Sequence, residues 1–233
     1  MKSRARLRPG KIIFVTGTDT GVGKTIFTGL LVHHLQSAGL NALAMKPFCS
    51  GSRADVRLLR GMQNGKLTEE EINPFYFPEP VAPLVSARRR KHAISLGEVL
   101  GRINEIAVRC ECLVIEGSGG LLVPLGEKYL VSDVIERLNC EVIVVSRNQL
   151  GTINHTLLTV AALKRLGVKK MAIALMETGK KDASVTTNGR VLGELLKPIL
   201  IRGVAFLGRN ANKIGVLKNS AKKMKKTLAG FCG

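Results

Sequence analysis

A glycine-rich segment, GTDTGVGKT at residues 17–25, carries the residue types that bind a phosphate chain. It follows an apolar run at residues 12–15 and precedes an amphipathic stretch at 26–35, which predicts a strand, a tight turn and a helix. Glycines let several backbone N–H groups converge on one anion, and the helix N-terminus adds positive charge. Lys24 would then reach the outer phosphates, and the hydroxyl of Thr25 would ligate magnesium.

The spacing of this loop departs from the usual pattern, because five residues rather than four separate Gly17 from Gly23. The alternative is an ordinary glycine-rich turn between a strand and a helix. The strand–turn–helix context favours a phosphate loop, with Lys24 and Thr20 in catalytic positions. We expect the nucleotide to be bound by a contiguous set of residues: Asp19, Thr20, Gly21, Val22, Gly23, Lys24 and Thr25.

Three further polar motifs stand where apolar runs end: KPFCSG at residues 46–51, EGSGG at 116–120 and LGTINH at 150–155. Lys46 could hold a charged substrate group against the γ-phosphate, although a lysine before a proline turn can also be an ordinary surface residue. Glu116 closes an apolar strand, which is the usual position of a carboxylate linked to magnesium. Asn154 suits a helix N-cap and could also contact substrate, whereas we assign no role to His155.

These segments contain oxygen donors that could bind a magnesium ion. Mg²⁺ prefers a few hard oxygen ligands. We expect Thr25, Glu116 and one further acid to hold it, and Asp55 is the candidate because it opens a short helical pattern after the Lys46 turn. The alternative for Asp55 is an acid that merely stabilises a helix N-terminus.

The elements that must position these side chains alternate along the chain. Apolar strand candidates occupy residues 11–17, 41–46, 112–116, 141–146, 171–176 and 204–207, and helix candidates occupy 25–37, 95–109, 132–138, 154–166 and 186–196. Gly39 and Gly167 stand where helices should end. Alternation of this kind predicts a single-domain α/β fold with a doubly wound, mostly parallel sheet and helices on both faces. Ligands bind such sheets beyond the carboxyl ends of the strands.

Residues 61–93 are the least regular part of the chain. Their proline density excludes a central strand, and we expect a long excursion that covers one edge of the site. No linker divides the chain. The prediction is therefore one domain at residues 11–210, a basic flexible N-terminus at 1–10 and a basic C-terminal tail or helix at 211–233.

The net charge of +19 is concentrated at the ends, because residues 1–18 and 195–233 hold five and nine Lys/Arg and no acid. The last basic cluster lacks the interleaved aromatic residues that stack on bases, so we expect a solvated tail and no nucleic-acid partner. No apolar run is long enough to span a membrane, and no signal-peptide segment follows the N-terminus, which predicts a cytoplasmic protein. The five cysteines show no metal-binding spacing and are expected to be free or structural thiols.

These motifs together resemble those of dethiobiotin synthetases. The phosphate loop with its extra residue, Lys46-Pro47 with Ser50-Gly51, the Glu116 glycines and the LGTINH segment occur in the family's order and at similar intervals, over residues 11–207. The resemblance implies a P-loop NTPase-like fold and a ligase of biotin biosynthesis. Its substrates would be 7,8-diaminopelargonic acid, CO₂ and ATP with Mg²⁺.

The resemblance also implies roles for individual residues. Lys24 and Lys46 would stabilise the transferring phosphoryl and carbamate groups, while Thr25, Asp55 and Glu116 would hold magnesium. The family forms homodimers with the substrate tail at the subunit interface, so Asn154 would serve the partner's site. The residues implied to bind the substrate are Lys46, Ser50, Gly119, Leu150 and Asn154.

Departures from the family pattern fall around the nucleotide base. The family's adenine-reading Asn is Met176 here, and methionine is only a weak hydrogen-bond acceptor. The family's Gly-x-Ile-Pro segment is GVAF at residues 203–206, and a Tyr of its substrate tail site corresponds to Asn188. The Lys that usually precedes the Leu-Gly of the third motif, LGTINH, is Gln149 here. We therefore expect intact phosphate chemistry with relaxed nucleotide selectivity.

Two other classes of function compete with the ligase. A switch ATPase of the partitioning or septum-positioning (ParA/MinD) type shares the fold, but it usually carries an extra lysine early in the loop, where this chain has Thr18, Asp19 and Thr20. A nucleic-acid-binding module would explain the net charge, but it leaves the phosphate loop, Lys46 and Glu116 unexplained.

Overall fold

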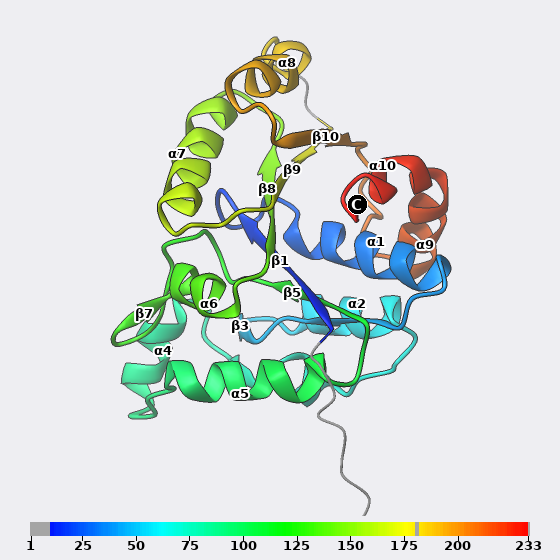
Figure 1. Ribbon diagram of the computed structural model, residues 1–233. Coiled ribbons are helices and arrows are strands. Elements are labelled where there is room, and N and C mark those ends of the chain that lie inside the picture. Colours follow the sequence, from blue (N-terminus) through cyan, green and yellow to red (C-terminus); the bar gives the residue numbers. More distant parts are fainter. Residues whose placement is uncertain (1–9, 180–181, 233) are drawn as a thin grey trace, which may run out of the picture.

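Six parallel strands form the central sheet of the computed structural model, which describes residues 10–179 and 182–232 (Figure 1). The strands lie in the order β10-β9-β8-β1-β5-β2, and every adjacent pair is parallel. They are β1 (Lys11–Gly17), β2 (Ala42–Met45), β5 (Cys112–Glu116), β8 (Glu141–Arg147), β9 (Met171–Met176) and β10 (Leu200–Val204). This order confirms the predicted doubly wound α/β sheet.

Ten helices accompany the sheet within the described residues. They are α1 (Lys24–Ser37), α2 (Ala54–Met62), α3 (Glu69–Ile72), α4 (Pro83–Arg89), α5 (Leu96–Ala107), α6 (Val131–Leu138), α7 (Thr152–Arg165), α8 (Val185–Leu195), α9 (Ile214–Lys223) and α10 (Lys225–Ala229). Figure 1 shows the sheet nearly edge-on, with α6 and α7 on one side and α1, α9 and α10 on the other. In the described part of the chain, no helix combines the length and the hydropathy needed to cross a membrane.

The core is mostly aliphatic, as the composition predicts. Val15, Val114 and Val144, from three adjacent central strands, are fully buried, because a parallel sheet covered on both faces leaves no polar side. The five cysteines are free thiols, which confirms that expectation. Gly39 and Gly167 follow α1 and α7 with φ of 93° and 75°, a conformation that stops a helix and that glycine adopts without strain.

The last strand differs from its prediction. The apolar run 204–207 was expected to form it, but β10 spans Leu200–Val204 and pairs with β9 from Ala172 to Met176. Arg202 and Gly203 interrupt the apolar pattern, and they are tolerated because β10 is an edge strand on which both residues are exposed. Residues 205–207 therefore lie beyond the strand, at the carboxyl edge of the sheet.

The irregular stretch 61–93 contributes no central strand, as predicted. It contains α3, α4 and the short strand β4 (Phe75–Phe77), which pairs with β3 (Phe48–Ser50) in a separate two-stranded sheet. Strands β6 (Pro124–Gly126) and β7 (Tyr129–Leu130) form a second small sheet.

The basic C-terminal segment forms a pair of packed helices, which is the helical alternative of the prediction and not the solvated tail. Leu217, Leu228 and Phe231 are buried, and the Phe231 ring meets Phe27 of α1 edge-on at 5.1 Å between centroids. An amphipathic helix can direct its lysines outward while its apolar stripe joins the core, so lysine content alone hides the buried face. The basic N-terminus expected at residues 1–10 lies outside the described residues except for Gly10.

Candidate active site

The phosphate loop joins β1 to α1 and lies at the carboxyl edge of the sheet. Gly21 and Gly23 have φ of 71° and 104°, so the loop needs the left-handed conformation that glycine permits. Gly23 is the N-cap of α1, and among the described residues no side chain caps this helix end. Its backbone N–H groups are therefore oriented to bind an anion.

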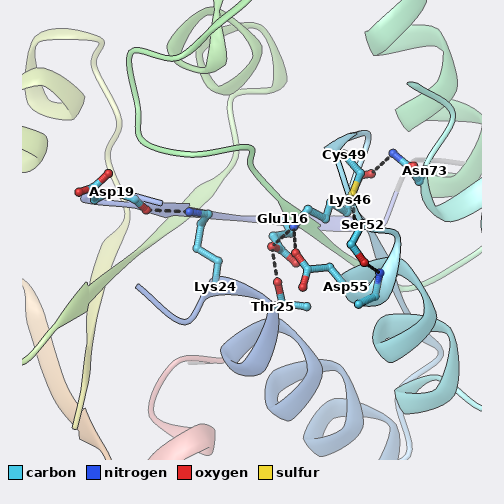
Figure 2. A network of polar contacts seen from close by, with 10 residues as sticks. Asp19, Lys24, Thr25, Lys46, Cys49, Ser52, Asp55, Asn73 and Glu116 are labelled. Carbon is cyan, nitrogen blue, oxygen red and sulfur yellow. Dashed lines mark hydrogen bonds and ion pairs between the residues drawn. The ribbon is translucent and has the colours of Figure 1, made fainter. Parts of the chain in front are cut away.

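Lys24 folds over this loop, and its Nζ donates a hydrogen bond to the carbonyl oxygen of Asp19 at 2.8 Å (Figure 2). The Asp19 carboxylate accepts a hydrogen bond from the backbone N–H of Thr20 at 2.6 Å. Burial lowers the pKa of Lys24 from 10.5 to about 8, although the nearby charge of Glu116 opposes the shift. The charge of Lys24 is therefore not fully balanced within the protein, and a bound phosphate could supply the missing counter-charge.

Glu116, at the end of β5, joins the phosphate loop to Lys46. Its Oε1 accepts hydrogen bonds from the hydroxyl of Thr25 at 2.7 Å and from Nζ of Lys46 at 2.8 Å. Lys46 also forms an ion pair with Asp55 at the start of α2, so its ammonium bridges two carboxylates (Figure 2). The structure thus brings together Thr25, Lys46, Asp55 and Glu116, which are distant in sequence.

The ammonium of Lys46 is held charged in a buried place. Burial alone would lower the pKa of Lys46, but the charges and hydrogen bonds of Glu116 and Asp55 outweigh it and raise this pKa above its ordinary value. Asn73 fixes the backbone of the turn, because its Nδ2 donates to the carbonyl oxygens of Lys46 and Pro47 at 3.0 and 3.1 Å. Asn73 is itself buried, and sequence analysis had assigned it no role at the site.

The oxygen atoms around Glu116 fit a magnesium ion. Glu116 is 1% exposed, and its buried Oε2 has no hydrogen-bond partner among the described residues. This oxygen, the Asp55 carboxylate and the Thr25 hydroxyl are hard donors of the kind that Mg²⁺ takes. The described residues contain no cluster of three or more His, Cys, Asp or Glu, so nucleotide phosphates and water would complete the coordination.

A cleft of about 780 Å³ opens above this cluster. Thr20, Ser50 and Gly119 line it with the two lysines, and so do Pro80 to Pro83 of the irregular stretch, as predicted for an excursion that covers the site. Asn212 and Ile214, from the C-terminal segment, also line it, and no motif in the sequence signalled this contribution. Gly119 has φ of 65° and so needs the conformational freedom of glycine.

A second groove of about 990 Å³ lies on the other side of the phosphate loop. It is lined by Gly21, Val22 and Gly23, by Met176 at the end of β9, and by Leu150 and Phe206. Gly21, Gly23 and Ile26 line both cavities, so a ligand that crosses the loop could occupy the two together.

Two predicted substrate contacts lie away from the catalytic cleft within one chain. Leu150 is 80% exposed and faces the second groove, and Asn154 is exposed on the first turn of α7, outside the residues that line either cavity. Asn154 is not a helix N-cap, because α7 begins at Thr152 and Gly151 is its cap. Asn154 was predicted to be the cap because Asn is a common N-cap residue, whereas the chain enters α7 through Gly151, which has a positive φ.

Asn188, which stands where the family has a Tyr of the substrate tail site, is buried in a network of amide groups. It is 2% exposed, and its Nδ2 donates to Asn148 Oδ1 at 2.9 Å and to the Gln149 carbonyl at 3.2 Å. A buried amide with these bonds stabilises the turn after β8. Arg147, which sequence analysis overlooked, donates from Nη2 to the carbonyl oxygen of Gly21 and so braces the phosphate loop.

Comparison with known proteins places this geometry in a family. A family model described as an AAA domain matches residues 11–208. The ATP-dependent dethiobiotin synthetase BioD of Bacillus licheniformis is 42% identical over 71% of this chain and 72% of its own length, and that of Bacillus subtilis strain 168 is 38% identical over 91% and 92%.

Solved structures show the same fold at much lower identity. A putative plasmid partition protein of Borrelia burgdorferi aligns with a TM-score of 0.63 and 14% identity over 97% of this chain and 98% of its own. The septum site-determining protein MinD of Pyrococcus horikoshii aligns with a TM-score of 0.57 and 17% identity over 96% and 99%. At 38–43% identity over most of both chains, the synthetase relatives are far closer, and the chain belongs to the dethiobiotin synthetase family.

Proposed function

We propose that the protein is an ATP-dependent dethiobiotin synthase, which carboxylates 7,8-diaminopelargonic acid and closes its ureido ring in cytoplasmic biotin biosynthesis. The names of its relatives support this activity. The observation that carries the proposal is the pair of buried lysines, Lys24 and Lys46, that line one cleft together with Glu116. Two cations in one cleft suit a reaction in which a carbamate must approach a triphosphate, because both reactants are anions.

The proposed reaction has three steps. One substrate amine adds to CO₂ and loses a proton, which gives a carbamate. A carbamate oxygen then bonds to the γ-phosphorus while the bond from that phosphorus to the bridging oxygen of ADP breaks, which gives a mixed carbamic-phosphoric anhydride. The second amine attacks the carbamoyl carbon and loses a proton, phosphate leaves with its oxygen, and the ring closes.

The lysines supply charge and position in this scheme. Lys24 exchanges its internal bond to the Asp19 carbonyl for the outer phosphates, while the amides of Gly21, Val22 and Gly23 and the residues beside them hold the chain. Lys46 turns its ammonium to the carbamate and γ-phosphate oxygens, where charge develops during transfer. Thr20 lines the same cleft, and its hydroxyl donates a hydrogen bond to an oxygen of the transferring group.

Magnesium would be held by Thr25, Asp55 and Glu116, and when bound it neutralises charge on the transferring phosphoryl group. In the structure Lys46 bridges the same two carboxylates. The ammonium thus pairs with both carboxylates, and it would turn to the substrate when another cation neutralises them.

The substrate tail is proposed to lie between two subunits of a homodimer. Gly119 and Ser50 line the catalytic cleft, whereas Asn154 is exposed on the first turn of α7, and Leu150, just before that helix, lines the second groove. Leu150 and Leu158 are 80% and 62% exposed, and exposed leucines of this kind favour an interface. Asn154 of one subunit would then bind the carboxylate of the substrate in the other.

Phosphate release with magnesium, bicarbonate and 7,8-diaminopelargonic acid tests the activity, with mass spectrometry to detect the ureido product. We expect phosphate and the product in equal amounts. Nucleotide hydrolysis that is independent of the diamine, with no ureido product, would point instead to a switch ATPase. The packed apolar face of α9 and α10 already counts against a membrane-binding switch of that class.

Subunit complementation tests the shared site. Lys46→Ala and Asn154→Ala homodimers should each be impaired, and mixing them should create heterodimers with one intact site, restoring up to about a quarter of the wild-type activity under random assortment. If mixing restores nothing while the heterodimer is shown to form, both residues serve the same subunit.

A further inference from the structure

The second groove continues from the phosphate loop and has the position of a base site. It lies at the carboxyl ends of β9 and β10, and Gly21 and Gly23 separate it from the catalytic cleft while lining both. A nucleotide whose phosphates lie on the loop would therefore extend its base into this groove. The question is which side chains the base would meet.

The floor of the groove is apolar. Met176 is 8% exposed and packs against Gly23, where a Cβ atom would come within 3.2 Å of its Cε. A thioether fixed in this way offers neither the donor nor the paired acceptor that reads the edge of a base.

The wall is aromatic. Phe206 follows β10 and is 52% exposed, although it is a large apolar side chain. Gly179 approaches its ring so closely that a Cβ there would lie 3.0 Å from Cε1 and Cζ. The backbone at Gly179 thus packs against the ring, and both residues line the groove.

Three of the four charged side chains that line the groove, those of Arg147, Glu177 and Asp182, have partners within the protein. Glu177 Oε1 accepts a hydrogen bond from Asn148 Nδ2 at 2.9 Å, and Asp182 accepts from the backbone N–H of Leu150 at 3.0 Å. Arg147 donates to the carbonyl oxygen of Gly21. These bonds engage three of the charged groups that could distinguish one base edge from another, and they leave Arg209 as the fourth.

We infer that Phe206 is a stacking platform for the nucleotide base, and that the enzyme recognises the base by its face rather than by its edge. Every base has a π-face, so stacking tolerates changes of base. The inference rests on the proposed nucleotide site and adds the residue that binds the base. It assigns a structural cause to the relaxed nucleotide selectivity that Met176 predicts, and it extends the ligand class to purine and pyrimidine nucleotides.

Calorimetric titration with ADP, GDP, CDP and UDP, each with Mg²⁺, tests the inference without any turnover. Wild-type dissociation constants should lie within about tenfold of one another, and Phe206→Leu should weaken all four by a similar factor of about 5 to 150. Phe206→Tyr, which keeps the π-face, should restore binding to within about threefold. Pyrophosphate, which lacks a base, should bind wild type and Phe206→Leu equally.

Leu195→Ala is the matched control, because Leu195 is 59% exposed on α8 and lines neither cavity. It should leave all four affinities unchanged. A wild-type preference for ADP over CDP by 100-fold or more would overturn face-based recognition. So would a Phe206→Leu variant that binds nucleotides as tightly as wild type, or one that loses as much affinity for pyrophosphate as for nucleotides. Since only binding is measured, a chain that binds all four nucleotides but makes no ureido product would refute the ligase and leave this inference standing.

Discussion

Replacing Lys46 with alanine tests the central cluster through stability and catalysis together. The Lys46 side chain is 10% exposed, and it pairs with Glu116 at 1% and Asp55 at 45% exposure. Removing one partner of a buried ion pair typically costs about 3–5 kcal/mol, because a charge remains unpaired in a poorly solvated place. Asp55 can regain water, so we expect a loss near the low end, about 3 kcal/mol, in the free energy of unfolding.

The catalytic loss has a separate size. A charge-assisted contact made at the reacting centre is worth about 2–4 kcal/mol of barrier, which corresponds to a decrease of about 30- to 900-fold in kcat/KM. Urea denaturation gives the first quantity, and the ureido-product assay gives the second. Magnesium should stabilise the variant more than the wild type, because a divalent cation can replace the ammonium between Asp55 and Glu116.

Lys11→Ala provides the matched control for this experiment. Lys11 pairs with Glu141 at 2.9 Å at the surface, where the two side chains are 35% and 22% exposed. A lysine–glutamate pair of this exposure contributes about 0–1 kcal/mol, so this variant should fold and turn over almost as wild type. Near-normal turnover of Lys46→Ala would refute the assigned role of Lys46, and unchanged stability would show that the pair with Glu116 is not formed in solution.

Four further outcomes follow from the contacts of Lys24, Asn73 and Phe231. Burial lowers the pKa of Lys24 to about 8, so ATP affinity should fall by up to about tenfold per pH unit above pH 8. The Lys24→Arg variant should bind ATP with little dependence on pH. Titration calorimetry from pH 7 to 9.5 checks both expectations. Lys24 in the folded state gives up its proton before the unfolded chain does, so its contribution to stability should increase between pH 8 and 10.5, and a decrease would contradict the shift. Asn73→Ala leaves the Lys46–Pro47 carbonyls without their donor and should cost about 1–3 kcal/mol in urea denaturation, with kcat lowered more than KM is raised. Phe231→Ala removes the ring that meets Phe27 and should lower the free energy of unfolding by about 3–5 kcal/mol. Lys226→Ala, on the exposed side of α10, should change that free energy by less than about 0.5 kcal/mol. Equal effects of the two substitutions would mean that the C-terminal helices do not pack in solution.

The phosphate loop and the central strands could be predicted from sequence because their signals are local. β1, β5 and β9 have the predicted bounds, since each is an uninterrupted apolar run that is buried on both faces. Residues 17–25 could be interpreted as a phosphate loop because Gly21 and Gly23 mark the two positions that need positive φ. Lys46, Asp55 and Glu116 could be named because each ends a strand or begins a helix beside that loop.

The remaining features depend on contacts that no short window contains. Arg202 and Gly203 are admissible in β10 only because the strand lies at an edge, and this fact belongs to the sheet rather than to the segment. Asn73 positions Lys46 across 27 residues, and Phe206 becomes a candidate base contact only once β10 is known to end at Val204. The packed face of α9 could not be predicted from the number of lysines along the segment. It depends on the apolar residues that share one face of the helix, opposite the lysines.

The cluster of Lys46 and Glu116 is a consequence of strand register. In the parallel pair of β2 and β5, Met45 lies opposite Ile115. The residue that follows each of them is Lys46, just after β2, or Glu116, the last residue of β5, and these two meet. In the pair of β1 and β5, Val15 lies opposite Glu116, which brings the carboxylate beside the start of the phosphate loop. A slip of one residue in either pair would direct the Glu116 side chain to the opposite face, away from Thr25. The geometry of this cluster therefore depends on the pairing of buried apolar residues such as Ile13 with Val114 and Leu43 with Leu113. We expect substitutions at these positions to lower the yield of ureido product without touching a reactive group.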